Sequence, residues 1–230
     1  MNLPPNSRLY PVFKAMSFDQ PQSWRDVRVR WANNESQNET WKPRGQKAWQ
    51  DYRESTFNRF GTSHLIWSLF GIEKPEVVIP ELTCGSFKKL KKRFNWPCKY
   101  SSKYPTFREL ASSNGFERIR LKDKIQEEAE TNSSREVRLL VEYLIRLMNS
   151  QDVLIIARKP RGQDHLEVID GIHYCLAFML GLANEIKVES KITIAIGEQV
   201  RSHKRRSWNR FAKEFSDTQR LQRLHSQELV

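Results

Sequence analysis

Residues 153–197, VLIIARKPRGQDHLEVIDGIHYCLAFMLGLANEIKVESKITIAIG, decide the fold of this chain. The stretch begins with a continuous apolar run, which is typical of a buried strand. Pro160 and Gly162 mark a polar turn, and Gly171 separates a second apolar run from a helical one. In order, we expect a strand, a polar loop, a returning strand, a helix and a third strand, over residues 153–157, 158–165, 166–170, 171–182 and 192–196. This order predicts a small mixed α/β sheet with packed helices.

A helix is predicted directly before this stretch. Ser133-x-x-Glu136 has the form of a capping box. It precedes an apolar stripe with helical spacing, made of Val137, Leu140, Val141, Leu144, Ile145 and Met148. The stripe is expected to pack on the sheet.

The region upstream is less regular and rich in aromatic side chains. Four tryptophans, Trp24, Trp31, Trp41 and Trp49, occur within 26 positions. Thr62-Ser63 is expected to cap a short apolar helix over 64–70, and residues 76–79, bounded by two prolines, are expected to form a short strand. We therefore divide the chain into an aromatic-rich and basic region (1–125), an α/β module (135–197) and a basic C-terminal helix (198–230).

The amino-acid composition limits the chemical class of binding partner that we expect. The 230 residues contain 39 Lys and Arg against 27 Asp and Glu, a formal net charge of +12. Such a surplus favours anionic partners, which can be nucleic acid, nucleotide phosphates or acidic lipid, and does not choose among them. The sequence has no apolar run of membrane-spanning length and no signal-peptide pattern, so we expect no membrane span and a cytoplasmic location. Three widely spaced cysteines indicate reduced thiols.

The most specific local pattern is the junction Val168-Ile-Asp-Gly-Ile-His173. A strand, a tight glycine and a helix together direct free backbone N–H groups at an anion. Asp170 could orient a hydroxyl or a metal-bound water, and His173 could contact phosphate or move a proton. Three basic residues of the preceding loop could close over the same site: Arg158, Lys159 and Arg161. The alternative is purely structural, with an ordinary cap, a turn glycine and a packing histidine.

These residues resemble the ParB/sulfiredoxin superfamily, whose signature turn has a glycine, one variable residue, a histidine or arginine and then an arginine, followed by a helix with a small residue. The resemblance covers residues 135–197. Gly171 matches the signature glycine, His173 its histidine or arginine, and Ala177 lies near the small helix residue. The resemblance implies a small α/β fold that binds a nucleotide, with or without Mg²⁺, or another phosphate-bearing ligand at this turn.

The sequence also departs from the family. Tyr174 stands where the family usually has arginine. Ile172 stands where sulfiredoxins carry their catalytic cysteine, and Cys175 lies three residues later, on another side of the helix. The resemblance therefore does not imply sulfinic acid reduction, and whether any reaction occurs stays open.

The alternative function is non-enzymatic binding of nucleic acid by basic segments 84–104 and 198–215, in which aromatic residues are interleaved with cations. The cations concerned are Lys88, Lys89, Lys91, Lys92, Arg93, Lys204, Arg205 and Arg206. The C-terminal helix could also lie on an anionic membrane surface or on its own domain, and docking on its own domain is the favoured outcome. A third possibility is a structural protein that keeps the fold without the chemistry. The five histidines are scattered, so no metal site is predicted.

Overall fold

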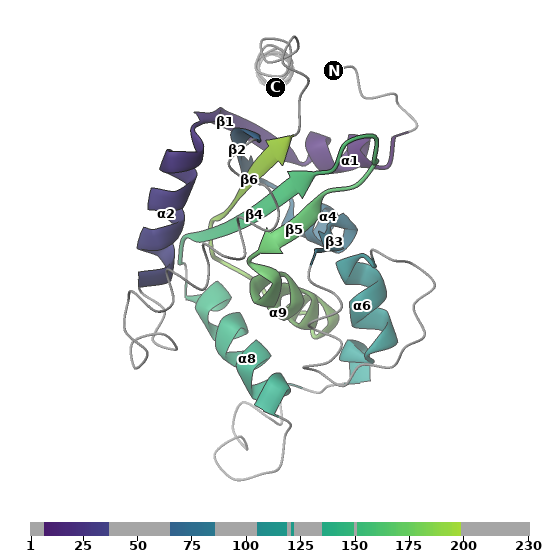
Figure 1. Cartoon of the computed structure of the whole chain (residues 1–230). Helices are drawn as coiled ribbons and strands as arrows, with labels where there is room; N and C mark the ends of the chain where they lie inside the picture. Colours follow the sequence, from purple (N-terminus) through teal and green to yellow (C-terminus); the bar gives the residue numbers. More distant parts are fainter. Residues whose placement is uncertain are drawn as a thin grey trace, which may run out of the picture.

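A mixed six-stranded sheet forms the centre of the protein (Figure 1). The structure, a computed structural model, describes residues 7–36, 65–85, 105–118, 121, 135–149 and 151–198. The strands lie in the order β1-β2-β6-β4-β5-β3. In chain order they are β1 Met16–Gln22, β2 Ile66–Ile72, β3 Thr83–Cys84, β4 Val153–Lys159, β5 Glu167–Asp170 and β6 Ile192–Glu198. The predicted mixed α/β class is confirmed, and both halves of the chain contribute strands to one sheet.

The strands of the quoted stretch occupy the middle of the sheet. β4 pairs in parallel with β6 and antiparallel with β5. β6 also pairs antiparallel with β2, and every residue of β6 is buried. Because β4 and β6 are covered on both faces of the sheet, neither strand needs polar residues at alternate positions. Both are therefore continuous apolar runs. The three strands predicted in this stretch are confirmed.

Helices cover both faces of the sheet. α2 lies along one side of it, and α8 and α9 lie together below it in the view of Figure 1. The helical segments are α1 Leu9–Lys14, α2 Trp24–Ser36, α4 Pro75–Val78, the 3-10 turn η3 Ile79–Glu81, α6 Phe107–Ser113, the 3-10 turn η4 Phe116–Arg118, α8 Arg135–Met148 and α9 Ile172–Ala183.

Alternation along β4 divides the core into two layers. Ile155 and Ala157 belong to the larger layer, which includes α8 and α9. Leu154 and Ile156 belong to a smaller layer under α2, which includes Trp31. Because successive strand residues point to opposite faces, α2 and the α8–α9 pair lie on opposite sides of the sheet.

Two predictions for the upstream region are wrong. The segment 64–70, expected to be a helix, contains most of strand β2. β2 is hydrogen-bonded on both sides, to β1 and β6, and an apolar run buried in this way has no period that distinguishes it from a helix. The segment 76–79, expected to be a strand, is helical in α4 and η3. Pro75 occupies the first helical turn, where proline is favoured, rather than the edge of a strand.

The predicted helix over α8 is confirmed, but its buried face is rotated. Ile145 is 42% exposed and Met148 37% exposed, whereas Tyr143 and Leu147 are buried. The exposed pair and the buried pair both continue the apolar stripe from Leu140 with helical spacing. The sequence pattern alone therefore does not show which pair is buried. Tyr143 therefore lies inside the protein, next to α9.

The predictions for both basic segments concern residues outside the described ones. They are Lys88, Lys89, Lys91, Lys92 and Arg93 in the first segment, and Lys204, Arg205 and Arg206 in the second. The basic C-terminal helix stays a prediction for the same reason. Among the helices of the described ranges, none has the length and apolar character needed to cross a membrane.

Candidate functional site

The junction between β5 and α9 is built around Gly171. This residue has φ +87° and ψ 12°, in the left-handed region, and forms the N-cap of α9. A Cβ atom here would lie 3.2 Å from the Cα of Ile155 and 3.3 Å from its Cγ1. Two features of this position favour glycine. Other residues are strained at this φ, and the backbone of β4 lies close to the place that a Cβ atom would occupy.

Asp170 turns toward the layer under α2. It is 6% exposed, and its Oδ2 accepts a hydrogen bond of 2.7 Å from the indole Nε1 of Trp31. The sequence pattern makes Asp170 a candidate catalytic residue or a helix cap. In the structure the cap position belongs to Gly171, and the carboxylate joins the sheet to α2.

His173 turns toward the opposite layer. It lies in the first turn of α9, half-buried, with its ring stacked on Tyr143 of α8 at a centroid distance of 5.3 Å and an interplanar angle of 20°. Tyr174, which replaces the arginine of the resembled family, is buried and contacts Tyr143 edge to face at 4.7 Å. Asp170 and His173 therefore lie near each other in sequence but face different sides of the sheet.

Two of the three basic residues, Arg158 and Lys159, belong to strand β4 and not to the predicted loop, because their backbone continues the pairing with neighbouring strands, and acids on those strands hold both side chains. Arg158 Nε donates to Glu167 Oε2 at 2.6 Å, and Lys159 Nζ donates to Glu198 Oε1 at 3.1 Å. Both glutamates are buried. Arg158 is paired with the first residue of β5, whereas α9 begins after the last one, so the length of β5 separates Arg158 from the junction. Arg161 is exposed in the turn between the two strands.

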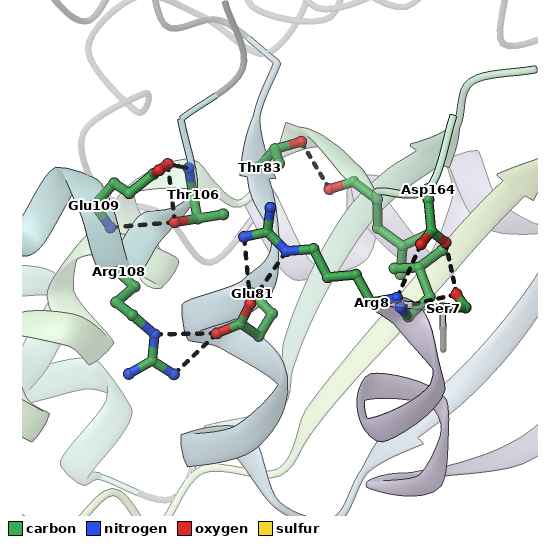
Figure 2. A network of polar contacts seen from close by, with 10 residues as sticks. Ser7, Arg8, Glu81, Thr83, Thr106, Arg108, Glu109 and Asp164 are labelled. Atoms are coloured by element: carbon green, nitrogen blue, oxygen red, sulfur yellow. Dashed lines mark hydrogen bonds and ion pairs between the residues drawn. The ribbon is translucent and has the colours of Figure 1, made fainter. Parts of the chain in front are cut away.

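A polar network anchors this loop to the N-terminal helix (Figure 2). Ser7 Oγ donates to Asp164 Oδ1 at 2.6 Å, and the backbone N–H of Arg8 donates to Asp164 Oδ2 at 2.8 Å. The guanidinium of Arg8 also reaches Glu81 Oε2 at 3.3 Å, while Arg108 Nε donates to Glu81 Oε1 at 3.0 Å. The loop is therefore tied directly to the start of α1, which Glu81 in turn connects to Arg108 of α6.

Two titratable side chains near these elements have shifted pKa values. Burial lowers the pKa of His165, and the nearby carboxylate of Glu167 opposes that shift. Burial raises the pKa of the Cys175 thiol well above its ordinary value, with smaller contributions from Cys84 and Asp170. A buried thiol that stays protonated is a poor nucleophile, so Cys175 is a packing residue of α9.

The junction thus combines the start of α9, which has no side-chain cap, with the half-buried imidazole of His173 on the α8 side. It does not bring Asp170 and His173 together as an acid–base pair. Within the described ranges no group of three or more His, Cys, Asp and Glu side chains could hold a metal ion. Trp31 and Tyr143 are neighbours of the site that were not predicted from the sequence. Only Tyr143 had a local signal, its helical spacing from Leu140 and Leu147.

No protein-family model matches the sequence, and neither the curated proteins nor the solved structures contain a match to it.

Proposed function

We propose that this chain is a ParB/sulfiredoxin-like protein that binds a nucleotide or another phosphate-bearing ligand at the turn Asp170-Gly171-Ile172-His173. The observation that carries the proposal is the β5–α9 junction, where a left-handed glycine ends the strand and α9 starts without a side-chain cap. Helix N-termini attract anions through their N–H groups and the helix dipole. His173 adds a titratable ring in the first turn of the same helix.

The residues have separate roles in this proposal. Gly171 keeps the turn tight against Ile155, and His173 contacts phosphate. Asp170 acts as a positioning residue, because its Oδ2 is engaged by Trp31 on the other side of the sheet. The proposal concerns binding and assigns no reaction.

Calorimetric titration tests the proposed binding of a nucleotide at this turn. The purified chain is titrated with CTP and with ATP, each with and without Mg²⁺, and so are the variants His173→Gln and His165→Gln. The two histidines are both half-buried, but His165 lies at the far end of β5. We expect binding that His173→Gln weakens at least tenfold and that His165→Gln leaves within twofold. Equal effects of the two variants, or no binding by the unaltered chain, would show the proposal to be wrong.

A second candidate, nucleic-acid binding, is favoured by where the charge lies in the sequence. The described residues contain 16 Lys and Arg against 17 Asp and Glu, so the remaining residues hold the whole basic surplus. One of these segments, 86–104, has seven Lys and Arg and no acid. Polycation–nucleic acid affinity falls steeply with salt because neutralised phosphates release counterions.

The second candidate has its own test. Affinity for a single-stranded oligonucleotide is measured between low and moderate salt for the unaltered chain and for a variant with Lys88, Lys89, Lys91 and Lys92 changed to Gln. We expect a steep salt dependence that becomes shallower in the variant, while His173→Gln leaves it unchanged. An affinity that does not respond to salt would exclude this mode of binding.

A further inference from the structure

Tyr143 is the centre of a cluster that joins α8 to the start of α9. Its ring stacks on His173 at 5.3 Å and packs edge to face against Tyr174 at 4.7 Å. The guanidinium carbon of Arg146, one turn further along α8, lies over the same ring at 5.2 Å. Tyr143 is itself only 8% exposed. The ring therefore holds a cation and an imidazole in defined positions on two different helices.

Arg146 has a charge that no acid in the described residues neutralises. It is half-buried, and it forms no ion pair within the part of the chain that the structure describes, although Glu142 lies four positions earlier on α8. A guanidinium packed over an aromatic ring leaves the N–H groups at its edge available to an acceptor. Two parallel N–H groups match the oxygens of a phosphate, which makes arginine the preferred partner for that group.

We infer that Arg146 contacts the phosphate chain of the ligand bound at His173, and that Tyr143 is the positioning residue that holds both side chains for it. This inference rests on the proposed function and adds a second helix to the site. The centre of the His173 ring and the guanidinium carbon of Arg146 lie 5.3 Å and 5.2 Å from the centre of the same ring, so both groups are neighbours of Tyr143, and a chain of linked phosphates is the kind of ligand that can contact both. The ligand class is a nucleoside di- or triphosphate, whose linked phosphates bind both groups.

Arg146→Gln removes the charge and keeps an uncharged polar group on a shorter side chain, so it is the central variant. Arg138→Gln is its matched control, because Arg138 is an exposed arginine two turns earlier on the same helix. Arg146→Lys keeps the charge but loses the planar group. All three are titrated with CTP and with inorganic triphosphate, alongside His173→Gln, and melting temperatures without ligand verify that each variant is folded.

We expect Arg146→Gln to weaken binding of both probes about tenfold or more, as for the loss of a charge-assisted hydrogen bond. Arg146→Lys should recover part of the affinity, and Arg138→Gln should change it less than twofold. If Arg146→Gln binds like Arg138→Gln while His173→Gln has lost binding, the inference about Arg146 is wrong and the proposed function stands. If the unaltered chain binds neither probe, both are wrong.

Discussion

The indole of Trp31 and the carboxylate of Asp170, 139 positions apart in the chain, are joined by a buried hydrogen bond of 2.7 Å. Trp31 is 4% exposed and Asp170 is 6% exposed. The bond connects α2 to the last residue of β5, directly before Gly171. The N-terminal region thus supports the candidate turn from the face of the sheet opposite to His173.

Trp31→Phe removes the donor and leaves a buried carboxylate with one partner fewer. We expect the free energy of unfolding to fall by about 1–3 kcal/mol or more, since an unsatisfied buried group is costly. Urea unfolding followed by circular dichroism measures the loss. The same substitution in an Asp170→Asn background should cost less, because the two residues are coupled. Strictly additive losses would show that the bond contributes nothing to stability.

The central elements of the fold were predictable because their signals are local. Gly171 lies between an apolar strand and an apolar helix, and both are found where the sequence places them. β2 was assigned wrongly because a strand buried between two others has no alternation. Tyr143 was left outside the predicted stripe, since Ile145 and Met148 satisfied the same helical spacing.

Of the candidate site, the sequence predicts the course of the backbone but not the directions of the side chains. The sequence indicates a strand, a glycine and a histidine in order, but not which face of the sheet each side chain takes. Arg158 could not be paired with Glu167 in advance, because the pairing depends on the register of β4 against β5. Trp31 has no local signal at all, since its contact with Asp170 depends on how α2 packs on the sheet.

Gly171→Ala should destabilise the protein more than Gly162→Ala does. Both glycines have a positive φ, +87° and +70°, so both substitutions introduce backbone strain of about 1–2 kcal/mol. At Gly162 a Cβ atom meets nothing within 4 Å, whereas at Gly171 it lies 3.2 Å from the backbone of Ile155. The difference between the two unfolding free energies therefore measures the packing of the turn against β4. Equal losses would mean that β4 moves away at no cost.

Lys159→Met should destabilise the protein strongly. The side chains of Lys159 and Glu198 are 11% and 6% exposed, and they pair at 3.1 Å. Removing the lysine leaves a buried carboxylate without its cation, which costs about 3–5 kcal/mol in comparable pairs. The double variant Lys159→Met with Glu198→Leu should recover much of this loss, because no charge remains buried. Urea unfolding of the two variants compares them, and a double variant as unstable as the single one would contradict this explanation.

His165 should make the protein less stable as the solution becomes mildly acidic. Burial lowers the pKa of His165 in the folded state below the ordinary histidine value of 6.5, against the opposing charge of Glu167. The unfolded chain therefore binds a proton near pH 6.5 that the folded chain takes up only at lower pH. The stability that His165 contributes is complete above pH 6.5 and is lost as the pH falls through the folded pKa. His165→Gln should reduce the difference in unfolding free energy between about pH 7 and about pH 5. Every other titrating group is common to both proteins, so the change in this difference isolates His165. If both proteins lose the same stability on acidification, the folded pKa of His165 is not lowered.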